Sequence, residues 1–194
     1  MSESSIDSGL HLTVPIGPSV NHYLAYRAVM KGKKAICTSY CTKEAKEYKK
    51  LIKELVTEEV SSQGWMLTPN KNQHFYVDAV FYFPRVDMDS SNYFKVLLDA
   101  ITETQLIWLD DNVACERVQG VYYDYDNPRI EILISPVDYI GVFPDASHLA
   151  EFKSKCAGCA RYTRNCSLLQ KAIEGKIQPE ITGGQCLKYK QKKE

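Results

Sequence analysis

The segment 87–111 most constrains the fold, because it places a short apolar helix between groups of acidic residues. Large apolar side chains occur almost all around the stretch 91–104, which predicts a helix buried in a hydrophobic core. Helical spacings of three and four residues put Asn92, Lys95 and Asp99 on one face of this helix. Burying these polar groups costs several kcal/mol unless they are paired or bind a metal.

Acidic residues flank the helix on both sides. Asp89 precedes it, and Asp110 and Asp111 follow it after an apolar turn. A helix of about ten residues is roughly 15 Å long, so this pair must fold back to meet Asp89. Carboxylate oxygens are the usual ligands of Mg²⁺, and Mg²⁺ beside a lysine suits chemistry on a phosphodiester. The structural alternatives are a simple Lys95–Asp99 ion pair and a solvated turn at the two aspartates.

Elsewhere, alternating and helical patterns predict a mixed α/β domain. The expected elements are a strand at 11–16, a basic hairpin at 22–40, a helix after Thr42 that stops at Gly64, a strand at 75–83, the helix at 91–104, and strands at 113–123 and 130–134. A short turn with Asn127 and Pro128 separates the last two strands, so we expect them to form a hairpin. The domain should cover residues 1–136, and residues 137–194 should form a linker (137–148) and a Cys-rich extension.

Lysine and arginine together number 24, as do aspartate and glutamate, so the net charge is zero. The basic residues are nevertheless concentrated at 22–53 and 141–194, and such segregation can create a footprint for nucleic acid. No apolar run approaches the roughly 18 residues of a membrane span. The N-terminal residues lack the basic and apolar regions of a signal peptide. We therefore expect a cytoplasmic protein with no membrane contact.

The chain has seven cysteines, and this odd number argues against a disulfide framework. Four of them lie near the C-terminus, spaced as Cys156-x2-Cys159-x6-Cys166-x19-Cys186. A tetrahedral set of four cysteines is a common structural Zn²⁺ site. An iron–sulfur cluster is the runner-up, and unligated thiols are the third alternative. The extension has few large apolar residues, which favours a metal, because so small a unit usually needs a covalent or metal staple.

The polar positions of the segment 87–111 resemble the signature of the RusA-type Holliday junction resolvases. The family pattern is D-x-D-N-x-x-K-x-x-x-D-A-L, followed by a doubled aspartate and then a valine. This chain has Asp89-Ser-Ser-Asn92-x-x-Lys95-x-x-x-Asp99-Ala-Ile, then Trp108-Leu109-Asp110-Asp111 and Val113. The opening stretch 14–21 is similar to the family's P-x-x-P-S-x-N turn. The resemblance covers roughly residues 11–136.

One position departs from the family pattern. The second aspartate of the pattern falls on Ser91, a neutral and weaker metal ligand. Asp87 or Asp110 could supply the missing charge. Aligning Asp87 and Asp89 as the pair would keep both carboxylates, but it needs an insertion before Asn92.

The resemblance implies a RusA-like fold, with a small mixed sheet and two helices. It also implies a Mg²⁺-dependent endonuclease that resolves four-way DNA junctions by paired symmetric nicks, leaving 5′-phosphate and 3′-hydroxyl ends. The implied Mg²⁺ ligands are Asp89, Ser91, Asp110 and Asp111. The implied catalytic residues are Asp89, Lys95 and Asp111, with Asn92 and Asp99 orienting the site.

Symmetric nicking needs two sites related by a two-fold axis, so the resemblance also implies a homodimer. The basic residues expected to contact the DNA backbone are Arg27, Lys31, Lys33 and Lys34. Two other functions stay open. One is a nuclease with a broader preference for branched DNA, and the other is a non-catalytic DNA-binding protein whose site is degraded at Ser91.

Overall fold

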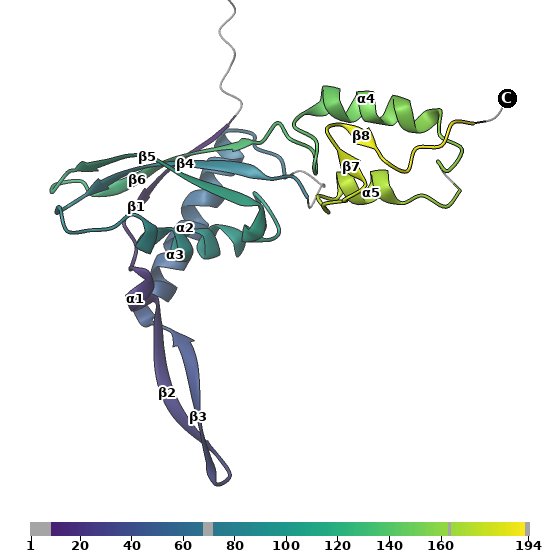
Figure 1. Cartoon of the computed structure of the whole chain (residues 1–194). Coiled ribbons are helices and arrows are strands. Elements are labelled where there is room, and N and C mark those ends of the chain that lie inside the picture. Colours follow the sequence, from purple (N-terminus) through teal and green to yellow (C-terminus); the bar gives the residue numbers. More distant parts are fainter. Residues whose placement is uncertain (1–8, 68–71, 163, 193–194) are drawn as a thin grey trace, which may run out of the picture. The chain divides into compact units, whose positions relative to one another are not determined.

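The computed structural model describes residues 9–67, 72–162 and 164–192. The chain divides into two compact units, Met1–Pro136 and Val137–Glu194 (Figure 1). Within the described residues, every helix is too short or too polar to span a bilayer.

The first unit is built on a four-stranded mixed sheet with the strand order β1-β6-β4-β5. The strands are β1 (Leu10–Pro15), β4 (Phe75–Phe83), β5 (Ala114–Tyr123) and β6 (Arg129–Pro136). β6 runs antiparallel to both β1 and β4, whereas β5 runs parallel to β4. The predicted strand at 75–83 is confirmed as β4, and every second side chain of it is buried.

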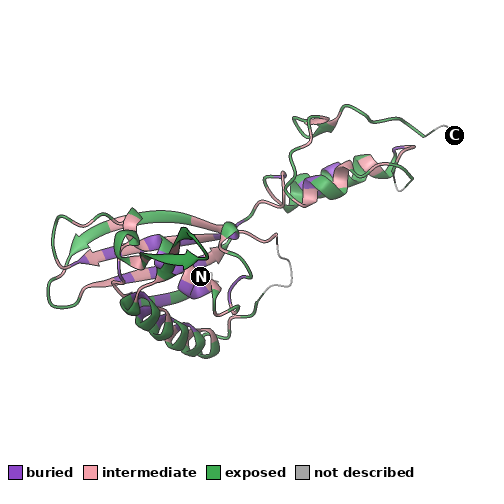
Figure 2. Ribbon diagram, turned by 90° about the horizontal axis from the view of Figure 1, so that it is seen from below, coloured by how far each residue is buried: buried purple, intermediate pink, exposed green. Residues whose placement is uncertain are grey.

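Two helices, α2 (Lys43–Ser62) and α3 (Ser91–Thr102), supply the other half of the core. Thr42 caps α2 as predicted, because its hydroxyl accepts a hydrogen bond from the N–H of Ala45 at 3.3 Å. Ile52 of α2, Leu97 of α3 and Phe81 of β4 are fully buried in one cluster. The buried residues lie along the strands and the sides of the helices that face them (Figure 2).

The expected hairpin between β5 and β6 is wrong, because β4 lies between these two strands. The chain leaves β4, passes through α3 and returns as β5 beside β4 and parallel to it. A parallel neighbour needs such a crossover, whereas a short turn serves only antiparallel strands. The turn after β5 then crosses the end of β4, where the N–H of Asp124 donates to the carbonyl of Phe83 at 2.8 Å.

The predicted basic hairpin is confirmed as β2 (Leu24–Lys31) and β3 (Lys34–Cys41), which pair only with each other. Gly32 makes the turn at a positive φ of 66°, a conformation that favours glycine. Nearly every residue of both strands is exposed. The hairpin extends away from the short helix α1 (Val20–Tyr23) that precedes it (Figure 1).

The second unit has a small core. Its elements are α4 (Ala146–Ala157), α5 (Leu168–Ile173), β7 (Ile181–Thr182) and β8 (Gln185–Cys186). The interpretation of 137–148 as a linker is wrong, because Phe143 is only 4% exposed and packs on Phe152 of α4. Asp145 also caps α4 by accepting the N–H of His148 at 2.9 Å.

Candidate active site

The N-terminus of α3 carries the first acidic residue of the candidate site. One carboxylate oxygen of Asp89 accepts hydrogen bonds from the N–H of Ser91 at 3.0 Å and from its hydroxyl at 2.9 Å. Both residues are exposed. A carboxylate is favoured here because the first turn of a helix has unpaired N–H groups and a positive partial charge. Ser91, where the family has an aspartate, thus holds Asp89 in place.

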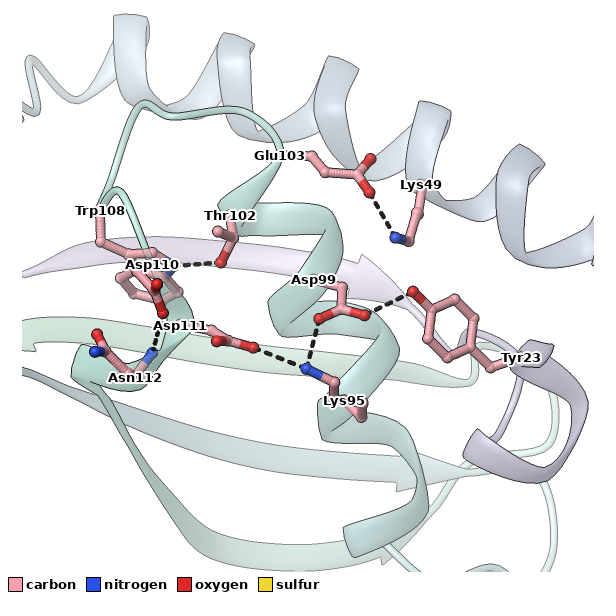
Figure 3. A network of polar contacts seen from close by, with 10 residues as sticks. All are labelled: Tyr23, Lys49, Lys95, Asp99, Thr102, Glu103, Trp108, Asp110, Asp111 and Asn112. Carbon is pink, nitrogen blue, oxygen red and sulfur yellow. Dashed lines mark hydrogen bonds and ion pairs between the residues drawn. The ribbon is translucent and has the colours of Figure 1, made fainter. Parts of the chain in front are cut away.

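The polar face of α3 is partly exposed, contrary to the expectation of a fully buried helix. The side chain of Lys95 is 55% exposed, whereas that of Asp99 is 19% exposed. The Lys95 Nζ lies 2.8 Å from an Asp99 carboxylate oxygen and 3.0 Å from one of Asp111 (Figure 3). The expected pair at i, i+4 therefore exists, and Asp111 joins it from beyond the helix.

The loop after α3 folds back because its apolar residues are buried and its backbone turns sharply. Ile107 and Trp108 are almost fully buried, and the indole N–H of Trp108 donates to the Thr102 hydroxyl at 2.7 Å. The side chain of Asp110 accepts the N–H of Asn112 at 3.0 Å and starts a 3₁₀ turn, Asp111–Val113. Asp110 is thus engaged in the turn, and Asp111 points to Lys95 (Figure 3).

Two side chains from other helices, Tyr23 and Lys49, extend this network, and no sequence pattern pointed to either of them. The Tyr23 hydroxyl of α1 donates to Asp99 at 2.6 Å. Lys49 of α2 pairs with Glu103 at 2.6 Å, and its Nζ lies 5.1 Å from the centre of the Tyr23 ring. The side chain of Lys49 is only 13% exposed.

The position of Tyr23 depends on a tight turn after β1. A side chain at Gly17 would place its Cβ 2.6 Å from the ring of Tyr48, so only glycine fits without a shift. The Tyr48 hydroxyl in turn donates to the Pro15 carbonyl at 3.1 Å. The proline- and glycine-containing turn therefore packs against α2 and sets the start of α1.

The electrostatics of the cluster keep Lys95 charged. Hydrogen bonds to Asp99 and Asp111 raise the pKa of Lys95 above its usual value. Burial raises the pKa of Asp99, but the hydrogen bonds from Lys95 and Tyr23 outweigh burial, so the net shift is downward. Lys95 is therefore a fixed positive charge rather than a proton acceptor, because a general base needs a pKa near the working pH.

The structure joins some of the expected site residues and leaves others apart. Lys95, Asp99 and Asp111 form one cluster, whereas no hydrogen bond or ion pair connects it to Asp89 among the described residues. Asn92 contributes the N–H that donates to the Asp89 carbonyl at 3.1 Å. In the described parts of the chain, no three Cys, His, Asp or Glu side chains form a group that could hold a metal ion.

Glu116 is an acidic neighbour that the sequence did not single out. It stands opposite Val77 in the parallel register of β5 and β4. Glu116 is exposed as a whole, but partial loss of hydration at its carboxyl group raises its pKa, the negative charge of Asp111 raises it further, and Lys95 lowers it. Glu116 lies near the cluster because β5 pairs in parallel with β4. The expected hairpin of β5 and β6 did not contain this pairing.

The family model for Endodeoxyribonuclease RusA matches residues 15–135, more than half of the chain. The chain belongs to the RusA family. No curated protein matches it. The match to RusA includes the hairpin, α2 and the whole cluster from Asp89 to Asp111, and it ends just before the second unit. Membership in RusA implies an endodeoxyribonuclease that acts on Holliday junctions and binds branched DNA.

Replacing Tyr23 by phenylalanine is expected to lower the free energy of unfolding by about 1 kcal/mol near neutral pH, because a hydrogen bond to a charged group is lost at a partly exposed site. The lowered pKa of Asp99 stabilises the fold above the ordinary aspartate pKa of about 4, and this contribution is lost as the pH falls through the lower, folded-state value. The difference between wild type and variant should therefore shrink in acid. Denaturant titration across pH measures it.

The matched control is Tyr26→Phe on the hairpin, since Tyr26 is 70% exposed and lies outside the cluster. This variant should unfold like the wild type at every pH. Equal destabilisation by both substitutions, or a Tyr23→Phe effect that does not vary with pH, would contradict the assigned hydrogen bond.

Proposed function

We propose that this protein is a Mg²⁺-dependent endonuclease that resolves four-way DNA junctions by paired, symmetric nicks. The observation that carries the proposal is the position of Lys95, whose Nζ lies 2.8 Å from a carboxylate oxygen of Asp99 and 3.0 Å from one of Asp111. Because 55% of the Lys95 side chain is exposed, its ammonium group can reach a DNA backbone. The match of the surrounding residues to the RusA family supports the same reaction.

The donor atoms of this surface suit Mg²⁺, because they are carboxylate and hydroxyl oxygens, the hard ligands that this ion prefers. We propose Asp89, Ser91, Asp110 and Asp111 as the residues that hold it. When bound, Mg²⁺ supplies a water of lowered pKa and polarises the phosphate. Ser91 keeps Asp89 oriented through the two hydrogen bonds described above.

The residues of the chain supply the remaining steps. Lys95 offsets the negative charge that builds on the phosphate as the bond to its leaving oxygen breaks, a contribution of about 10²- to 10³-fold in rate. Asp99 positions the ammonium group, Tyr23 positions Asp99, and Asn92 fixes the start of the helix. Cleavage on this pattern leaves 5′-phosphate and 3′-hydroxyl ends. Two symmetric nicks require two such sites, so we propose a homodimer.

The exposed hairpin is the proposed contact to the DNA backbone. Arg27, Lys31, Lys33 and Lys34 are all exposed, and Lys31 stands opposite Lys34 next to the turn. Like charges in this position repel each other, so a polyanion that lies across them is stabilising. The hairpin also exposes Tyr26 and Met30 by 70% and 66%, and an isolated two-stranded hairpin is only marginally stable in water.

The double substitution Lys33→Gln and Lys34→Gln is expected to weaken junction binding for all sequences alike. The slope of log K against log salt should fall by about 2, roughly one unit for each lost phosphate contact. Binding titrations at several salt concentrations measure this slope. The control pair is Lys43→Gln and Lys50→Gln on α2, whose side chains are 91% and 81% exposed. An equal change in the control, or no change in the hairpin variant, would contradict the proposed contact.

Two alternative functions can be separated from resolution by the choice of substrate. Four-way junctions, three-way junctions, flaps and linear duplexes with the same arm sequences should be compared in Mg²⁺. Paired nicks confined to the four-way junction support the proposal. Similar rates on flaps and three-way junctions would show a broader branched-DNA nuclease. Tight junction binding without cleavage would show a binding protein with a degraded site at Ser91.

A further inference from the structure

The second unit brings four cysteines from separate segments to one place. Cys156 lies in the last turn of α4, Cys159 lies in the turn that follows, Cys166 precedes α5, and Cys186 lies on β8. All four line a single cavity of about 370 Å³. All seven cysteines of the chain are free thiols, so no disulfide explains this gathering.

The four thiols are also shielded from solvent. Cys159 is buried, and Cys156, Cys166 and Cys186 are partly buried. Because all four line the same cavity, they gather at one sheltered place rather than being scattered over the surface.

Backbone groups are already directed at one of these sulfur atoms. The N–H of Lys190 donates to the Sγ of Cys159 at 3.5 Å. The backbone N–H groups of Arg161 and Tyr162 also form hydrogen bonds to it. Metal-bound groups are commonly oriented and tuned by such hydrogen bonds from outside the ligand set.

Main-chain hydrogen bonds tie the C-terminal segment to the turn that contains Cys159. The N–H of Ala160 donates to the Lys190 carbonyl at 2.7 Å, and the N–H of Lys192 donates to the Gly158 carbonyl at 3.2 Å. The apolar core nearby is small, with Phe143, Leu149, Phe152 and Ala172 as its buried residues. A unit with so little buried apolar surface usually needs a disulfide or a metal to stay folded.

We propose that Cys156, Cys159, Cys166 and Cys186 bind one structural Zn²⁺ per chain. Four thiolates satisfy the tetrahedral preference of this ion and leave no open position for a reactant. In the described residues the four sulfur atoms do not form a group with metal-binding geometry. Binding of the ion therefore requires the sulfur atoms to move closer together within the cavity that all four line. The site lies outside the segment that matches the RusA family and is independent of the proposed nuclease function.

The test uses the full chain, purified under reducing conditions. Elemental analysis is expected to give about one zinc per chain. A thiol reagent should then find three accessible thiols, those of Cys37, Cys41 and Cys115, and all seven after chelation. Cobalt added after chelation should produce the visible absorption of a tetrahedral tetrathiolate site. A brown protein with iron, or a metal-free protein with seven reactive thiols that takes up no cobalt, would overturn the proposal.

Two cysteine variants locate the site. Cys159→Ser should lose the metal and gain trypsin cleavage within residues 137–194, while the cleavage pattern of the first unit should not change. Cys37→Ser is the matched control, because Cys37 is exposed on β3 of the first unit, and it should keep both the metal and the protease resistance. If Cys159→Ser folds poorly, the cobalt spectrum of the wild type still decides the question. Full zinc content in Cys159→Ser would exclude this ligand set.

Discussion

Asp111→Asn is expected to lower Mg²⁺-dependent cleavage of a four-way junction by roughly 100-fold or more while leaving junction binding nearly unchanged. Asparagine keeps the shape of the side chain but removes its charge, which weakens the proposed metal site. The same change removes one of the two ion pairs of Lys95, at 3.0 Å. The cleavage rate should be measured at saturating DNA. Junction binding should be measured in a separate experiment without Mg²⁺, so that no cleavage occurs.

The matched control for this prediction is Asp126→Asn. Asp126 is an exposed aspartate of the same unit in the turn between β5 and β6. Its loss changes the net charge equally but leaves the cluster intact, so cleavage should stay at the wild-type rate. Full activity of Asp111→Asn would remove Asp111 from the site. If Asp87→Asn is as inactive as Asp111→Asn, the result would instead favour the alternative alignment, in which Asp87 and Asp89 are the two aspartates of the family pattern.

Lys95→Met is expected to reduce the cleavage rate by about 10²- to 10³-fold, since it removes a charge that acts on the transition state. Excess Mg²⁺ should not restore the rate, because the carboxylates remain. Because its pKa is raised, Lys95 stays protonated through the neutral and alkaline range. The plot of the wild-type cleavage rate against pH should therefore show no fall caused by deprotonation of this residue. Methionine preserves most of the apolar side chain, so the fold should be retained.

The effect of Lys95→Met on stability should be small. The Lys95 side chain is 55% exposed, and ion pairs of this kind contribute about 0–1 kcal/mol. Lys50→Met on the outer side of α2 is the control, and it should leave both cleavage and stability unchanged. If Lys95→Met cleaves at the wild-type rate, or if high Mg²⁺ restores it fully, then Lys95 has no role in offsetting charge on the phosphate.

Local patterns in the sequence predicted much of the first unit. The aromatic and β-branched residues at 75–83 identified β4, and Thr42 and Gly64 marked the ends of α2, because each signal depends on neighbours a few residues away. The spacing of Lys95 and Asp99 likewise predicted their ion pair. These features are local, so the sequence carries them directly.

Strand order and long-range contacts could not be predicted in this way. The sequence of the short turn after β5 is compatible both with a β5–β6 hairpin and with a turn that crosses the end of β4. The arrangement is decided by β4, which pairs with β5 along one edge and with β6 along the other. Tyr23 and Lys49 reach the cluster from α1 and α2, so no spacing within α3 reveals them. The partial exposure of α3 was also not predictable, because it depends on which side of the helix packs into the core, as Phe94 does against Phe81 of β4.

The most direct test of the account is cleavage of a labelled synthetic four-way junction by the full chain, with Mg²⁺ and with a chelator in its place. The account predicts two nicks placed symmetrically across the junction in Mg²⁺, with ends that a ligase can seal, and no nicks in the chelator. No cleavage at any Mg²⁺ concentration, or equal cleavage in the chelator, would contradict it.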